Sequence, residues 1–174
     1  MRIIFLDIDG VLNTAATKQR IPGEPYTGID PRRVEALKTL VDQSNKIDET
    51  IIVLSSSWRV GVDRFGHEIP GHYAYLRECL AEQGLSIYDE TPFLGDGSMR
   101  GKEIRFWIKD NWSLGITGIA ILDDEAFDFK EKKVSRYWVR TSWFNANGGL
   151  QAGNVRQALR VMQMEIPAYF KYEG

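Results

Sequence analysis

The sequence has little of what marks a disulfide-rich, secreted, membrane-bound or strongly charged protein. Cys79 is the single cysteine in 174 residues, so an internal disulfide and a thiolate metal site are both excluded, which suits a reducing compartment. The formal net charge is −2, which gives no overall attraction to nucleic acid, although this average can hide a local basic groove. No apolar run approaches a membrane span, and the stretch before Asp7 is too short for a signal peptide. We expect one soluble, cytoplasmic domain over residues 1–174, with no membrane association and no obligate protein partner.

Short hydrophobic runs predict the strands of a parallel sheet. The runs 2–6, 50–54 and 118–122 are continuous rather than alternating, as in strands buried on both faces. Residues 137–140 predict a fourth strand, and residues 85–88 give a weaker fifth signal. The sequence therefore predicts about five strands.

Helical patterns fall between these runs. Pro31 after Asp30 is a favourable helix start, and Gly84 ends a second pattern. Asn154 is placed to cap the last helix. The residues with helical spacing are Val34, Leu37, Leu40 and Val41, then Tyr73, Leu76 and Leu80, then Ile104, Trp107 and Ile108, and finally Val155, Ala158, Leu159 and Met162. This alternation predicts an α/β fold: a three-layer, Rossmann-like open parallel sheet.

Two loops are long enough to border a site but too short to form a large cap domain. They are residues 14–29 and 60–71, and each follows a region where a predicted strand ends. In open α/β sheets, ligands bind outside the carboxyl ends of the strands, so we expect both loops to border the site.

Acidic residues follow two of the predicted strands. Asp7 and Asp9 come after the first strand, and Asp123 and Asp124 follow the third. In a parallel sheet these groups meet at one edge, where Asp7, Asp9 and Asp123 would supply the hard oxygen ligands that Mg²⁺ prefers. A bound cation would also offset the repulsion between a carboxylate and a phosphate, about 4 kcal/mol for two unit charges about 4 Å apart at an effective dielectric of about 20.

Hydroxyl and basic groups are expected at the same edge. Ser55 and Ser56 follow the second strand, and a serine hydroxyl there could hold phosphate oxygens. Lys102 lies in the first turn of the third helix and would assist the cation. Acids, hydroxyls and a lysine at one edge indicate a magnesium-dependent phosphoryl site.

Four motifs in this order resemble those of the haloacid dehalogenase (HAD) superfamily. FLDIDGVLN resembles its first motif, IIVLSSSWR its second, Lys102 its third and ILDDE its fourth. Together with VRTSWFNANGGL, they are similar to small HAD domains associated with RNA-repair proteins and phages. The resemblance covers nearly the whole chain.

The resemblance implies a role for each motif residue. Asp7 would be the nucleophile that forms an aspartyl-phosphate and also binds magnesium, and Asp9 would be the general acid and then the base. Because phosphatases of this superfamily carry the second aspartate and dehalogenases do not, phosphate-ester hydrolysis is favoured. Asp123 would complete the metal site, and Asp124 would orient ligands or join the metal. Either Ser55 or Ser56 would bind phosphate, with a slight preference for Ser56.

The other notable histidine, tryptophan and basic residues are most simply interpreted as structural or solvent-exposed. His67 and His72 lack acidic companions at metal-ligand spacing, so we interpret them as loop residues. We expect Trp58 to pack against neighbouring loops, whereas Trp143 could offer a stacking face. Five basic residues are most simply solvated, and become candidate contacts to a phosphate backbone if they line the cleft: Lys18, Arg20, Arg59, Arg64 and Arg100.

We therefore expect a Mg²⁺-dependent phosphomonoesterase. Without a large cap the cleft would stay open, which favours a nucleic-acid 3′ or 5′ phosphate end as substrate. The alternatives are a phosphatase of nucleotides or other small phosphoesters, a non-catalytic HAD-like binding module, and a phosphotransferase. Phosphate release from an aryl phosphate, and capture of the phosphoryl group by an alcohol, would separate these alternatives.

Overall fold

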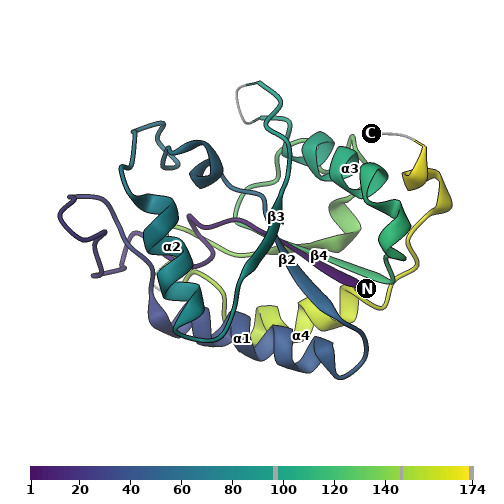
Figure 1. The fold of residues 1–174 in the computed structure, drawn as a ribbon, viewed down its shortest axis with the longest axis horizontal. Helices are drawn as coiled ribbons and strands as arrows, with labels where there is room; N and C mark the ends of the chain where they lie inside the picture. The colour runs from purple at the N-terminus through teal and green to yellow at the C-terminus, as the bar shows by residue number, and fades with distance from the viewer. Residues whose placement is uncertain (96–97, 146, 173–174) are drawn as a thin grey trace.

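Five parallel strands form one sheet in the order β3-β2-β1-β4-β5. Figure 1 shows the whole fold, with β2, β3 and β4 labelled. The structure is a computed structural model, and it describes residues 1–95, 98–145 and 147–172. The strands are β1 (Arg2–Leu6), β2 (Thr50–Leu54), β3 (Ile87–Glu90), β4 (Gly118–Asp123) and β5 (Trp138–Arg140), and the helices are α1 (Pro31–Asn45), α2 (His72–Ala81), α3 (Arg100–Asp110) and α4 (Ala152–Val161). The predicted α/β class and open parallel sheet are confirmed.

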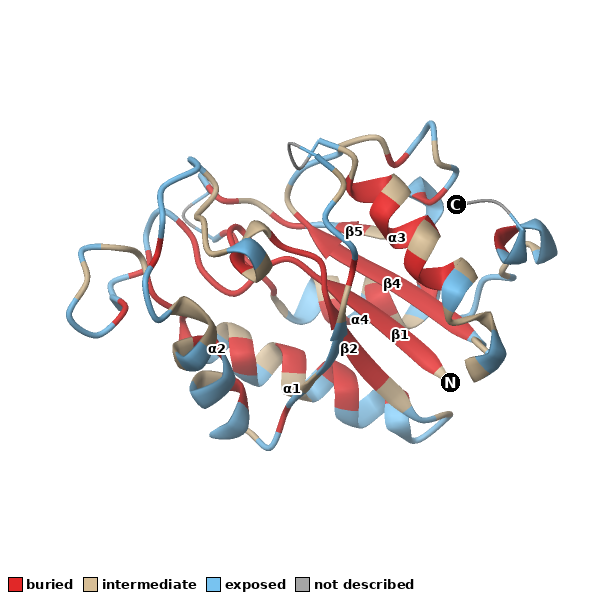
Figure 2. Ribbon diagram, turned by 45° about the horizontal axis from the view of Figure 1, so that its top comes forward, coloured by how far each residue is buried: buried red, intermediate tan, exposed pale blue. Residues whose placement is uncertain are grey.

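Helices cover both faces of this sheet, as Figure 2 shows. One face packs against α1, α2 and α4, and its core includes Ile4, Leu6 and Leu37. The other face packs against α3, where Phe5 meets Trp107 edge-on with ring centres 5.5 Å apart. Every residue of β1 and β4 is buried, which explains why both strands read as continuous apolar runs.

The helix ends follow local chemistry. The Asp30 carboxylate accepts a hydrogen bond from the Arg32 backbone N–H at 3.0 Å, so Asp30 caps α1 as predicted. The prediction for α4 was wrong by three residues, because the helix begins at Ala152 with Gln151 as its cap. Asn154 lies one turn in, where its side-chain oxygen accepts from the Gln151 N–H at 3.0 Å. Its bond is of the capping-box type, which places the acceptor three residues after the cap.

The two edge strands differ from their predicted ranges. β3 begins two residues later than expected, and its pairing with β2 shifts register between Ile52 and Val53. β5 loses its first predicted residue, Tyr137, to a short 3-10 turn. Edge strands pair on one side only, so the apolar pattern constrains their ends less than it does in the buried centre.

The topology places a binding edge beside β1. The chain leaves β1 towards β2 on one side and later returns to β4 on the other, so the connections diverge at the carboxyl end of β1. No large cap domain covers this edge among the described residues. None of the described helices is long and apolar enough to cross a membrane.

Candidate active site

A cavity of about 340 Å³ opens at the carboxyl ends of β1 and β4. The acidic part of its wall comes from the ends of the strands, and most of the remaining wall comes from the segment that follows β2. The loop 60–71 borders this cavity as predicted, whereas the loop 14–29 reaches only a smaller adjoining cavity through Tyr26 and Thr27. The cavity of about 340 Å³, called the catalytic cavity below, is lined by Asp7, Asp9, Ser57, Arg59, Val62, Asp63, Arg64, Gly66, Phe93, Ser98, Arg100, Asp124, Glu125 and Phe127.

Three carboxylates meet at this edge. Asp7, Asp123 and Asp124 each offer one oxygen, and these oxygens lie within 4.8 Å of one another. Asp7 and Asp123 are buried, so the cluster concentrates negative charge where water screens it poorly. Clustered carboxylate oxygens are the ligands that hard divalent cations prefer. The structure thus brings together acids that lie more than a hundred residues apart in the sequence.

Gly10 makes this close approach feasible. Its φ is +87°, and a Cβ atom placed there would lie 2.3 Å from Cγ of Asp124. Any other residue would therefore be strained and would also displace the Asp124 carboxylate. The glycine of the first motif is explained by the acid that packs against it.

Arg100 bridges the buried acids. Its Nη1 atom lies 3.2 Å from Oδ1 of Asp7 and 3.2 Å from Oδ2 of Asp123, and it also contacts the Ser55 carbonyl. Burial raises the pKa of Asp7, and the Arg100 guanidinium opposes that rise. Burial raises the pKa of Asp123 well above its usual range, and the Asp7 charge adds to it. Arg100 therefore compensates part of the negative charge of the cluster.

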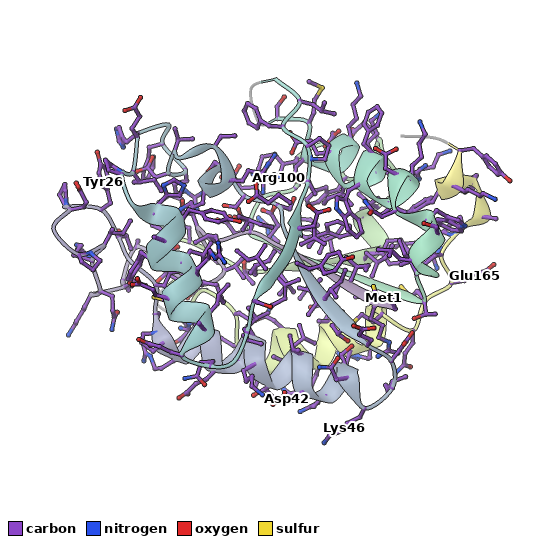
Figure 3. All side chains as sticks on the ribbon, viewed as in Figure 1. Met1, Tyr26, Asp42, Lys46, Arg100 and Glu165 are labelled. Carbon is purple, nitrogen blue, oxygen red and sulfur yellow. The ribbon has the colours of Figure 1, made fainter. Side chains whose placement is uncertain are left out.

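Figure 3 shows the position of Arg100 at the start of α3. Arg100 is the first residue of α3, and the picture labels it near the centre of the view. The loop residue Tyr26, by contrast, lies at the left margin. Side chains at the start of a helix tilt towards its N-terminus, which in α3 faces the carboxyl edge of the sheet. The position of Arg100 in the helix accounts for its reach into the site.

Asp9 lies beside the acid cluster and is held by three donors. Its Oδ1 accepts from Nδ2 of Asn13 at 2.8 Å, and its Oδ2 accepts from the Trp58 indole N–H and the Arg64 backbone N–H, each at 3.0 Å. Burial, followed by the charge of Asp7, raises the pKa of Asp9 to about 6, while the three hydrogen bonds oppose the shift. The carboxylate is thus fixed in direction next to Asp7.

Two expectations concern Asp9 and its surroundings. Asp9 was included in the predicted metal site, but the three acids that approach one another are Asp7, Asp123 and Asp124. A direct metal contact of Asp9 stays a prediction. Trp58 was expected only to pack against loops, yet it also donates its indole N–H to Asp9. An aromatic residue immediately after a strand-end serine run was the available sequence signal.

The serine run after β2 divides into different environments. The hydroxyl of Ser56 hydrogen-bonds to the Asp7 carboxylate and thereby lowers its pKa. The hydroxyl of Ser55 is buried and has no partner among the described residues, whereas Ser57 lines the cavity. Contact with Asp7 favours Ser56 over Ser55, and phosphate binding by either stays a prediction. Sequence reasoning missed Ser57.

Lys102 does not face the acids in this structure. Its Nζ lies 5.7 Å from the ring centre of Phe106 on the same helix. Residues two apart on a helix point about 200° apart, so Arg100 and Lys102 cannot both face the sheet edge. Asp128 fixes this orientation by accepting the backbone N–H groups of Gly101 and Lys102. Of these two basic residues of α3, Arg100 is the one that contacts the acids, and a phosphate contact by Lys102 stays a prediction.

Two further arginines line the cavity, and both are paired. Arg59 lies 2.5 Å from the fully buried carboxylate of Glu103, and Arg64 lies 2.9 Å from Asp124 and 2.7 Å from Glu125. Sequence reasoning did not identify Glu103, because its partner comes from another segment. The exposed side chains of Lys18 and Arg20 are not among the residues that line the cavity.

The histidines and Trp143 are also accounted for. His67 lies in a loop as predicted but has an acidic neighbour, because its Nδ1 lies 3.1 Å from Asp63. His72 is the first residue of α2 rather than a loop residue, and its Nδ1 contacts the Ile69 carbonyl. Neither histidine joins the acid cluster. The indole of Trp143 is largely buried, and the Arg64 guanidinium lies over it at 4.8 Å.

The open parallel sheet and the acidic edge agree with the resemblance to HAD domains seen in the sequence. The sequence model of the family described as "HAD domain in Swiss Army Knife RNA repair proteins" matches residues 3–155. The chain therefore belongs to this family of HAD domains.

Comparison with individual proteins adds one resemblance. No curated protein matches the sequence. Among solved structures, the cobalt-bound deoxy-D-mannose-octulosonate 8-phosphate phosphatase of Haemophilus influenzae is similar, with 17% sequence identity and a TM-score of 0.45. The similarity covers 93% of this chain and 86% of that one.

Proposed function

We propose that this protein is a Mg²⁺-dependent phosphomonoesterase that forms an aspartyl-phosphate on Asp7 and acts on phosphate at a nucleic-acid end. The observation that carries the proposal is the approach of Asp7, Asp123 and Asp124 within 4.8 Å beside a buried arginine. Proteins seldom bury several carboxylates together without a cation or a catalytic task.

The donor set fits a hard divalent cation. Asp7, Asp123 and Asp124 would hold it through carboxylate oxygens, with Asp9 as a further ligand. When bound, Mg²⁺ supplies positive charge that favours approach of a phosphate and stabilises its transfer. Arg100 already compensates part of the negative charge on Asp7 and Asp123.

The chain's own residues account for the two chemical steps. An oxygen of Asp7 attacks phosphorus, and the bond from phosphorus to the leaving oxygen breaks while Asp9 donates a proton to that oxygen. Asp9 then accepts a proton from the water that attacks the aspartyl-phosphate, which releases inorganic phosphate and restores Asp7. The donors Asn13, Trp58 and Arg64 hold the Asp9 carboxylate in one direction for both transfers.

The open edge supports a nucleic-acid end as substrate. No large cap covers the cavity among the described residues, so an extended chain can present a terminal phosphate. The rim carries exposed aromatic rings, Phe65 and Phe93, with an arginine near each. The description of the family, which places such domains in RNA-repair proteins, agrees with this substrate class. We further propose that the protein acts as one domain in the cytoplasm.

A phosphate-release screen tests the proposal. We expect Mg²⁺-dependent release from oligonucleotides with a 3′ or 5′ phosphate to exceed release from mononucleotides and sugar phosphates. Asp7→Asn should abolish release without unfolding the protein, and Asp110→Asn, at an exposed position on α3, is the matched control. Full activity of Asp7→Asn, or activity indifferent to EDTA, would overturn the nucleophile or the metal. Faster release from small phosphoesters would instead favour the alternative substrate.

A further inference from the structure

A second cavity adjoins the candidate active site on the β5 side. It has a volume of about 340 Å³, and it shares the lining residues Arg64, Asp124 and Glu125 with the catalytic cavity. The rest of its wall is formed by Arg140, the last residue of β5, and by residues 141–144, which follow it. A group bound there would lie next to a phosphate held at Asp7.

Arg140 gives this cavity a basic group that carboxylates do not neutralise. Within the described ranges, its side chain has no carboxylate within 4.0 Å, and it is exposed to solvent. By contrast, the three arginines of the catalytic cavity, Arg59, Arg64 and Arg100, are each paired with at least one carboxylate. The acids of the second cavity, Asp124 and Glu125, are those that Arg64 pairs with, so Arg140 remains available to an anion.

Phe144 gives the same cavity an exposed aromatic face. Its side chain is 79% exposed, far more than a packing role requires, although it follows the buried Trp143. The Arg64 guanidinium lies over both rings, with its Cζ 5.7 Å from the centre of Phe144 and 4.8 Å from that of Trp143. An exposed ring beside a cationic group is a suitable surface for stacking a nucleobase.

We propose that this cavity is a subsite for the nucleoside next to the terminal phosphate, with Phe144 stacking its base and Arg140 contacting the following backbone phosphate. The inference rests on the proposed function and adds that the substrate end is single-stranded and read with little base preference. Stacking needs an unpaired base, and every base offers a π-face. Phosphate, base and backbone contacts would then fall in line from the acid cluster to β5.

Binding of oligonucleotides to the Asp7→Asn variant tests the subsite without turnover. The probes are short single strands with a terminal phosphate, matched to strands whose terminal nucleoside lacks its base. We expect loss of the base to raise Kd about ten-fold, and Phe144→Ala to raise Kd similarly for the complete strand but not for the abasic one. Tyr172→Ala, another exposed aromatic side chain, should change neither value and serves as the control.

The salt dependence of binding tests Arg140. Arg140→Gln should reduce the slope of log Kd against log salt concentration by about 0.7, the value for one contact to a single strand. Arg156→Gln, at an exposed position on α4, should leave the slope unchanged.

The outcomes separate the subsite from the proposed function. The subsite would be overturned if Phe144→Ala raised the Kd of complete and abasic strands equally. It would also be overturned if removal of the base left the Kd for the Asp7→Asn variant unchanged. Phosphate release would stand in both cases. Phe144-dependent binding with no release from any oligonucleotide by the wild-type protein would overturn the proposed function instead. Tighter binding of a phosphopeptide than of any oligonucleotide would overturn both.

Discussion

Replacement of Arg100 by glutamine probes the balance of charge in the site. The guanidinium lies 3.2 Å from an oxygen of both Asp7 and Asp123 and is only 4% exposed. At this distance each ion pair has a Coulomb energy of about 5 kcal/mol at an effective dielectric of about 20. Much of that is offset by the cost of burying the charges, and removal of one partner from a buried pair typically costs about 3–5 kcal/mol. We therefore expect metal-free Arg100→Gln to lose about 3 kcal/mol of unfolding free energy.

A bound divalent cation should reverse much of this loss. It would take over the compensation of Asp7 and Asp123, so Mg²⁺ should stabilise Arg100→Gln more than it stabilises the wild-type protein. Urea denaturation in EDTA and in excess Mg²⁺ measures both differences, with Arg156→Gln as the surface control. If Arg100→Gln were as stable as the wild-type protein in EDTA, or gained no more from Mg²⁺, the electrostatic reasoning would be refuted.

Further predictions concern Gly10 and Asp9. Gly10→Ala, strained at φ +87° and pressed against Asp124, should cost at least about 2 kcal/mol of unfolding free energy and weaken Mg²⁺ binding in calorimetry; unchanged Mg²⁺ affinity would count against a metal role for Asp124. Trp58→Phe removes a donor to Asp9, so kcat/KM should fall about ten-fold, and the pKa of Asp9, followed by NMR, should rise. In EDTA the unfolding free energy should increase by about 1 kcal/mol from pH 7 to pH 5 through Asp9. The pKa of Asp9 is about 6 in the folded protein and 3.8 in the unfolded chain, so its contribution to the unfolding free energy is complete below pH 3.8 and is lost as the pH rises through 6. Asp9→Asn, measured in the same way, should lack this pH dependence.

The centre of the fold could be predicted from the sequence because burial leaves a strong pattern. The ranges of β1 and β2 were predicted to the residue, since their apolar runs are bounded by charged or polar residues. The predicted range of β3 began two residues too early, because β3 pairs along one edge only and is partly exposed, which leaves a weaker apolar pattern. Asn154 was assigned to the wrong capping position because cap and capping-box residues are of similar types.

The sequence predicted the site residues that lie at the ends of strands. It did not predict which long side chains reach them from other segments. The acids Asp7, Asp123 and Asp124 lie at or directly after the ends of neighbouring parallel strands, so topology alone brings them together. Arg100 and Lys102 are both basic residues near the start of one helix, and only the rotation of that helix decides which reaches the acids. Trp58 donates its indole N–H directly to Asp9, and the two residues are 49 positions apart in the sequence, so local spacing did not reveal this contact.

A crystal structure with Mn²⁺ in place of Mg²⁺ tests most directly whether these acids share one ion. We predict a single anomalous peak at the carboxyl edge of the sheet, with oxygens of both Asp7 and Asp123 among the ligands of the ion. Full occupancy of Mn²⁺ elsewhere, with no ion in contact with both side chains, would contradict the proposed metal site.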